Sequence, residues 1–279
     1  MEKGNPIRFP STANLLIDSV DRTSGTSGEF TISLNNSIMN GFFTRLAVSE
    51  VVLDWCVDNI SQELSSNSIT VVVDGVGALS VTIPDGQYTA KECMDALILA
   101  LNASPGLANT VFSLGTSVTG VKTLICEVNG NEEDFEIGNS NLAIYLNLEV
   151  NVQANNYPMK CPKLLPYTYI DFVSNSLTYN QALKDATTNT VFTNVLYRWN
   201  FAWDQETAVD AYGYPIYQGY RSFIARRALP FPKQIRWEPN QPIGQINFQV
   251  VGSDGVTVDP QKTNNGEFEW AMTCLVSEV

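Results

Sequence analysis

The stretch VTIPDGQYTAKECMDALILALN, residues 81–102, changes from a strand pattern to a helix pattern within a few positions. Val81 and Ile83 alternate with polar residues, which is the period of a half-buried strand. A proline and an Asp-Gly pair follow at positions 84–86 and favour a tight turn. The stretch therefore predicts a strand, a turn and the start of a helix inside a chain that otherwise reads as strands.

The helix is predicted to begin at a capping box, in which the Thr89 hydroxyl accepts the backbone N–H of Glu92. Its apolar residues then share one helical face: Ala90, Cys93, Leu97, Ala100 and Leu101. An amphipathic helix must pack on a partner. We expect this one to cover an open end or face of a β-sandwich.

The rest of the chain indicates that sandwich. About ten short segments alternate apolar and polar residues between turn signals, as strands of a sandwich or barrel do. Residues 42–55 are apolar on both faces, which is typical of a central strand, and residues 68–83 predict a hairpin. In the last segment one face carries Phe268, Trp270, Met272, Cys274 and Val276. A Pro-rich bend at 157–166 marks the most probable internal boundary.

Composition excludes several classes of function. The net charge is −13, so strong nucleic-acid binding and attraction to anionic membranes are not expected. Histidine is absent, which excludes an imidazole base and His-ligated metals. Five widely spaced cysteines predict reduced thiols in an intracellular environment. We expect no secretory leader, no membrane-inserted segment and no cofactor.

Three groups of residues, one aromatic and two acidic, have both a functional and a structural interpretation. Tyr197, Trp199, Phe201 and Trp203 alternate and could stack on sugars, but we favour the inner face of a strand. Asp204, Glu206 and Asp210 could supply a pair of glycosidase carboxylates, and Glu132, Glu133 and Asp134 could bind calcium. For both acidic groups we favour an exposed loop or turn, and we expect no catalytic residues.

A fourth group is basic and is predicted as a possible subunit interface. It concentrates five of the sixteen cationic residues in one segment: Arg221, Arg226, Arg227, Lys233 and Arg236. In an acidic chain this segment could contact the acidic face of an identical neighbour. The alternative, which we leave open, is a set of solvated positions on outer strand faces.

Read in order, the segments resemble one family over most of the chain. The segments are LLIDSVDRTSGTSGEFTISL, the opening stretch 81–102, FEIGNSNLAIYLNL, DFVSNSLTYNQALKDATT and FEWAMTCLVSEV. They are similar to the single jelly-roll penton (minor capsid) proteins of virophages, polinton-like viruses and relatives.

The resemblance implies an all-β fold, a single jelly-roll sandwich of two antiparallel Greek-key sheets with one or two short helices. Residues 1–12 would form an arm and 13–279 the jelly roll, with a possible outward lobe within 187–240. It also implies a non-enzymatic protein of the virion, assembled in the host cell interior. Five copies would form each vertex of an icosahedral double-stranded DNA virus, beside trimers of the major capsid protein. The alternative is a β-sandwich module that binds carbohydrate or serves as a spike.

Overall fold

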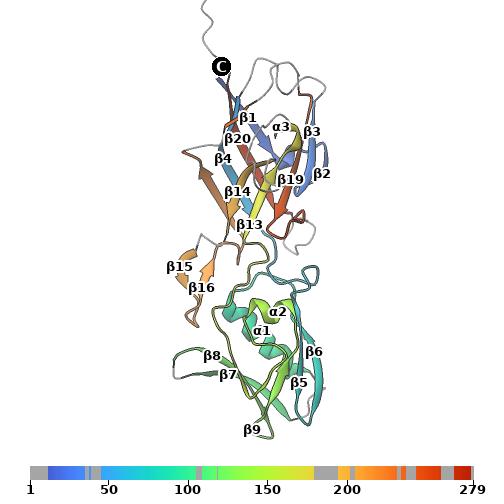
Figure 1. Ribbon diagram of the computed structural model, residues 1–279, viewed down its shortest axis with the longest axis vertical. Helices are drawn as coiled ribbons and strands as arrows, with labels where there is room; N and C mark the ends of the chain where they lie inside the picture. Colours follow the sequence, from blue (N-terminus) through green and yellow to red (C-terminus); the bar gives the residue numbers. More distant parts are fainter. Residues whose placement is uncertain are drawn as a thin grey trace, which may run out of the picture.

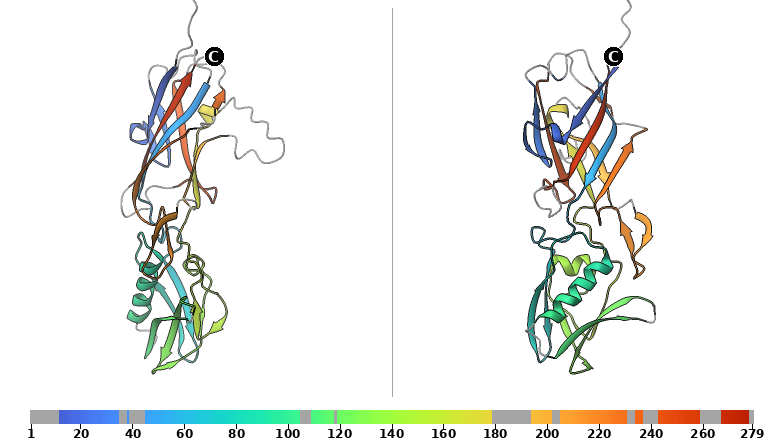
Figure 2. Two further views of the ribbon diagram at one scale, coloured as in Figure 1. Left: turned by 90° about the vertical axis from the view of Figure 1, so that its left-hand side faces the viewer. Right: turned by 180° about the vertical axis from the view of Figure 1, so that it is seen from behind.

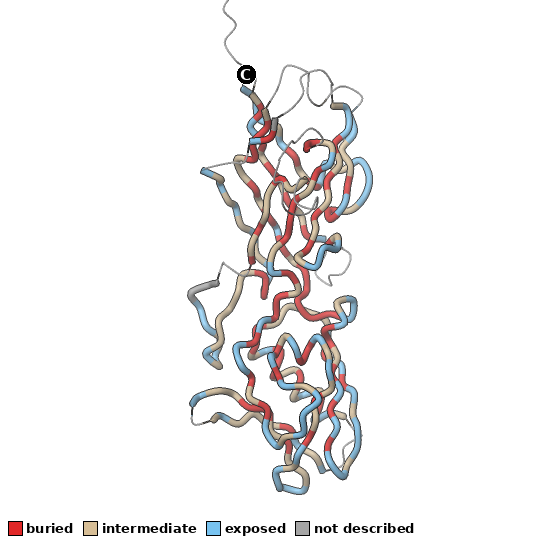
Figure 3. Tube along the Cα trace, viewed as in Figure 1, coloured by how far each residue is buried: buried red, intermediate tan, exposed pale blue. Residues whose placement is uncertain are grey.

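The chain folds into two parts that lie end to end in the computed structural model (Figure 1). The structure describes residues 12–34, 38, 45–104, 109–117, 119–178, 194–201, 205–230, 234–236, 243–258 and 267–277. One part is a sandwich of two antiparallel sheets. The other is built by residues 56–168, which we call the inserted lobe, and Figure 3 shows buried residues running through both.

Among the described residues, each sheet of the sandwich has five strands. The first runs in the order β1 (Thr12–Asp18), β20 (Glu269–Ser277), β4 (Arg45–Trp55) and β17 (Phe223–Ala228), and β18 (Gln234–Arg236) also pairs with β4. The second runs in the order β14 (Val195–Asn200), β13 (Tyr169–Val173), β19 (Gln245–Gly252), β3 (Glu29–Ser33) and β2 (Ser24–Thr26). Two short helices, η1 (Ser19–Asp21) and α3 (Asn175–Thr178), lie in the connections.

The pairing of these strands is that of a jelly roll. Without the short β2 and β18, eight of the ten strands remain, and they pair from the outside inward. The first pairs with the last, and so on: β1 with β20, β3 with β19, β4 with β17, and β13 with β14. A long antiparallel ribbon folded over on itself gives this arrangement. The predicted fold class, a single jelly-roll sandwich with few short helices, is confirmed.

Apolar alternation fills the space between the two sheets, as the sequence predicts. The five alternate residues of the last strand segment, from Phe268 to Val276, are all buried. The Trp270 ring lies 5.4 Å from the ring centroids of both Phe30 and Phe248, which come from the opposite sheet. These contacts between aromatic rings join the two sheets into one core.

The inserted lobe has its own sheets and helices between β4 and β13. Its elements are β5 (Ser68–Val73), β6 (Gly77–Thr82), α1 (Ala90–Ala103), β7 (Thr110–Thr116), β8 (Lys122–Val128), β9 (Asn131–Glu132), β10 (Phe135–Ile137), α2 (Asn141–Tyr145), β11 (Gln153–Ala154) and β12 (Asn156–Pro158). One sheet has the order β11-β10-β5-β6 and the other β12-β8-β7, with β9 beside β8. The Pro-rich bend at 157–166 leads back to the sandwich.

The predicted helix forms as α1, and both hydrogen bonds of its capping box are present. Its buried face includes Cys93, Met94, Leu97 and Leu101, and it packs on β6 and β7 (Figure 2). The prediction that it covers an end or face of the sandwich is wrong. The chain leaves the sandwich at Trp55, before the helix, and returns at Tyr169, so strands of the inserted lobe cover its apolar face.

Two predicted boundaries stay predictions. The arm at 1–12 falls almost wholly outside the described residues, whereas most of the range 187–240 is described, in the segments 194–201, 205–230 and 234–236. Within that range a hairpin of β15 (Gln205–Val209) and β16 (Pro215–Tyr217) extends from the sandwich toward the inserted lobe (Figure 1). Among the described residues, no helix is long and apolar enough to cross a membrane.

Candidate assembly surfaces

The strand β17 is an edge of the first sheet and carries part of the predicted basic segment. Its residues alternate between the core side and the outer face, so that Ile224, Arg226 and Ala228 point outward. The Ile224 side chain is 74% exposed. The Arg226 side chain is 73% exposed and forms an ion pair of 2.5 Å with Glu50 on the neighbouring strand β4. The outer face of this edge strand therefore carries the Arg226 cation between Ile224 and Ala228.

The other members of the basic segment lie in different surroundings. The Arg227 guanidinium lies 4.0 Å from the centre of the Trp199 ring, so this contact joins β17 of the first sheet to β14 of the second. Arg221 contacts the inserted lobe through Glu92, with 2.8 Å between nitrogen and oxygen. The backbone of Arg236 pairs with Arg45, but its side chain and the whole of Lys233 lie outside the described residues. The segment is not one surface, and its interface role stays a prediction.

At the opposite edge of the same sheet, β1 presents acidic and apolar residues. Leu16 is 73% exposed, and Val20, in the η1 turn that follows, is 65% exposed. Between them lies Asp18, whose Oδ1 accepts the backbone N–H of Val20 at 2.9 Å and caps η1. This edge is not among the sites that the sequence predicted. The alternation around buried Ile17 is the signal that could have identified Leu16 and Asp18 as outward-facing.

The β15–β16 hairpin binds the sandwich to the inserted lobe through Asp210. One oxygen of this carboxylate, Oδ2, accepts the backbone N–H of Lys91 in the first turn of α1 at 2.9 Å. The other oxygen accepts the N–H groups of Tyr212 and Tyr214 at 2.9 and 3.0 Å. An acidic side chain at a helix N-terminus is favourable because the helix dipole is positive there. Asp210 therefore acts as a clamp between the two parts.

A second set of contacts lies beside this clamp. The Tyr212 hydroxyl donates to Asp95 at 2.6 Å, and Lys91 pairs with the same carboxylate. Burial works to raise the pKa of Asp95, but the hydrogen bonds from Lys91 and Tyr212 outweigh it and hold that pKa below its usual value. Burial and the bond to Asp95 raise the pKa of Tyr212 to about 12. The Tyr214 hydroxyl donates to the backbone carbonyl of Met159 at 2.7 Å.

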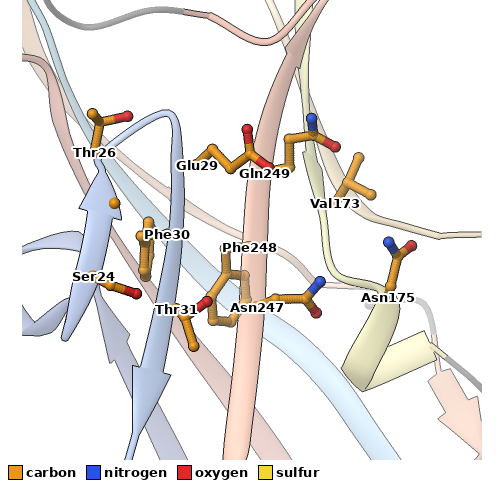
Figure 4. Close-up of a pocket in the computed structure, with 11 residues that line it drawn as sticks. Ser24, Thr26, Glu29, Phe30, Thr31, Val173, Asn175, Asn247, Phe248 and Gln249 are labelled. Carbon is orange, nitrogen blue, oxygen red and sulfur yellow. The ribbon is translucent and has the colours of Figure 1, made fainter.

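An open groove lies on the outer face of the second sheet, between β2, β3, β19 and the start of α3 (Figure 4). Its volume is about 520 Å³. Most of its lining is neutral and polar, and Glu29 is its only acidic residue among the described ones. The two aromatic residues there, Phe30 and Phe248, are buried in the core. The groove therefore offers no exposed ring on which a sugar could stack.

The other candidates from the sequence have structural positions. Trp199 and Phe201 are buried, which confirms the inner-face interpretation for these two, while Trp203 lies outside the described residues. Asp204 and the Glu206 side chain are likewise not described, and the Asp210 carboxylate is occupied by three backbone donors. The acidic run begins at Glu132 at the end of β9 and continues through the connection to β10. No group of three metal-binding side chains occurs among the described residues.

The sequence matches no known protein family and no curated protein. Comparison with solved structures does find similar folds. The mavirus penton protein matches with a TM-score of 0.50 at 12% sequence identity, over 98% of this chain and 100% of that one. A chain in the cryo-EM structure of the Sputnik virophage matches with a TM-score of 0.41 at 13% identity, over 96% of this chain and 97% of that one. The match to the mavirus protein spans both the sandwich and the inserted lobe, so this chain shares the fold of the mavirus penton protein.

Proposed function

We propose that this chain is a structural protein of an icosahedral virion and forms its fivefold vertices as a homopentamer. The observation that carries the proposal is the outside-inward pairing of eight strands, combined with a fold shared with the mavirus penton protein over nearly the whole chain. We further propose that the ring meets trimers of a major capsid protein and that the chain has no catalytic role.

The surface composition supports this proposal. Only 16% of the residues are charged, against roughly 25% in a typical soluble domain. Charged groups must lose water when a neighbouring subunit covers them, so a neutral polar surface assembles at a lower desolvation cost. Open edge strands also favour association, because their unpaired backbone N–H and C=O groups can hydrogen-bond to a strand of another chain. In a ring, each subunit would cover the edges of its neighbours.

The shape of the molecule suggests how it would stand in a shell. The inserted lobe and the two ends of the described chain lie at opposite ends of the sandwich (Figure 1). We infer that the sandwich forms the ring and that the lobe projects from it. The lobe would then stay clear of contacts between subunits.

Native mass spectrometry and negative-stain microscopy of the purified chain test the proposal. A mass of five chains and five-membered rings are the expected result. A chain that stays monomeric at high micromolar concentration would overturn the vertex role. A monomer that also binds a glycan array would instead support the carbohydrate-binding alternative.

A further inference from the structure

We propose that neighbouring subunits of the ring join edge to edge, with β17 of one copy against β1 of the next and Arg226 opposite Asp18. This inference rests on the proposed function, because it takes a closed ring of identical copies as its starting point. The occupant of each edge is therefore a second copy of this chain.

Both edges are open in the part of the chain that the structure describes. The strand β1 pairs only with β20, and β17 pairs only with β4. Three successive antiparallel pairings separate them, so β1 runs antiparallel to β17. A neighbour in the same orientation can thus bring β1 beside β17 as an antiparallel partner, which is the head-to-tail contact that a cyclic assembly requires.

Cyclic symmetry also constrains the positions of the contacting residues along the strand direction. Rotation about an axis that runs along the strands carries no translation, so groups that meet must lie at the same level on the two edges. The strand registers meet this condition. Arg226 is opposite Val52, Val52 is opposite Ala271, and Ala271 is opposite Asp18. The cation and the carboxylate therefore occupy one row that crosses the whole sheet.

The neighbouring row toward the start of β1 is also complementary. Ala228 is opposite Glu50, Glu50 is opposite Thr273, and Thr273 is opposite Leu16. In an antiparallel contact that places Arg226 against Asp18, exposed Ala228 faces exposed Leu16. The row of exposed Ile224 runs through Asp54 to Glu269 and ends there, because β1 ends at Asp18 and the η1 turn, with exposed Val20, follows it. In the two rows that cross the whole sheet, the Arg226 cation thus meets the Asp18 carboxylate, and Ala228 meets Leu16.

The existing contacts of the two charged groups leave room for this pair. The Arg226 guanidinium has five N–H donors, so it can keep its pair with Glu50 and bind a second carboxylate. Asp18 uses one oxygen to accept the backbone N–H of Val20. The second sheet offers a poorer contact, because Arg198 on its edge strand β14 already makes a two-bond pair with Asp171.

Charge reversal tests the contact, with mass photometry and native mass spectrometry measuring the concentration at which half of the chains are in pentamers. We expect that Arg226→Glu and Asp18→Arg each raise this concentration by at least about tenfold, since five contacts per ring change together. The double variant should restore assembly to within about threefold of the wild type. Asp18→Asn keeps an N-cap residue at η1 while removing the charge and should weaken assembly less than Asp18→Arg.

A mixture of the two single variants gives a sharper result. Complementary contacts then require the variants to alternate, and five is odd, so every closed pentamer keeps at least one like-charged contact. We expect the mixture to form open chains or even-numbered rings in place of pentamers.

Lys160→Glu in the inserted lobe is the matched control, because Lys160 is an exposed lysine away from both edges and pairs only with Glu149 among the described side chains. Circular dichroism verifies that each variant folds. Pentamers of the single variants at the wild-type concentration would overturn the inference and leave the vertex role intact. A wild-type chain that forms no ring would overturn the vertex role itself.

Discussion

Replacing Asp210 with alanine should release the inserted lobe from the hairpin that clamps it. The substitution removes an acceptor that serves three backbone N–H groups, two in the β15–β16 turn and one in the first turn of α1. The Lys91 N–H is among the first four of the helix, which have no partner within the helix. Without Asp210 it must turn to water.

The expected cost follows from these bonds. Hydrogen bonds to a charged group are worth about 1.5–3 kcal/mol each when buried, and less near solvent. An anion at a helix N-terminus adds about 0.3–1 kcal/mol. Because two of the three bonds are local to one turn and partly exposed, we expect Asp210→Ala to destabilise the junction by about 3 kcal/mol. Asp210→Asn keeps an acceptor oxygen and loses the charge, so we expect about 1 kcal/mol.

Hydrogen exchange measured by mass spectrometry can localise this loss. Each 1.4 kcal/mol corresponds to a tenfold change in the opening equilibrium. We therefore expect peptides that cover the start of α1 and the β15–β16 turn to exchange about a hundredfold faster in Asp210→Ala and several-fold faster in Asp210→Asn. Peptides from β20, in the core of the sandwich, serve as the internal reference. Unchanged exchange at the helix start, or an equal increase in β20, would refute the clamp.

Three further predictions concern other groups. Arg198→Met should lower the free energy of unfolding by about 2 kcal/mol in urea titration, because it leaves the mostly buried Asp171 carboxylate without its two-bond partner; an unchanged midpoint would contradict this. Iodoacetamide at pH 8 should modify exposed Cys161 and spare buried Cys93 and Cys274 in the folded protein. Burial raises the pKa of both buried thiols, that of Cys274 to about 12, so neither forms the reactive thiolate at this pH. Modified Cys93 or Cys274 in peptide mass spectrometry would contradict this. Tyr212 should ionise near pH 12, as measured by ultraviolet absorbance. In Asp95→Asn its pKa should move toward the usual value of about 10. Because the pKa of Tyr212 is raised in the folded state, its contribution to stability is complete below about pH 10 and is lost as the pH rises toward 12.

The sequence predicts local features well because their causes are local. The capping box at Thr89 and the hairpin at 68–83 depend on residues within a few positions of one another, and both form. The buried alternation of the last strand follows from its own pattern. The position of α1 does not follow in this way, because an amphipathic helix shows that a partner exists without showing which sheet supplies it.

The basic segment shows a similar division. Strand alternation alone sends Arg226 outward and Arg227 toward the core, so the separation of these two could have been predicted once β17 was recognised. The pair between Arg221 and Glu92 joins residues that are 129 positions apart. It depends on the β15–β16 hairpin reaching the inserted lobe, which no local pattern indicates.

The jelly-roll order of strands explains why the lobe and the proposed ring edges can coexist. Strands paired from the outside inward place successive connections at alternate ends of the sandwich. The insertion after β4 and the hairpin after β14 therefore leave from the same end, where Phe223 is opposite Trp55 and Tyr169 is opposite Asn200. The hairpin can reach the lobe and clamp it there, while β1 and β17 stay open along the sides. An insertion in the connection between β3 and β4 would instead emerge at the end of the sandwich where the described chain starts and stops. Because the lobe is inserted after β4, it lies at the opposite end of the sandwich from these two ends of the chain.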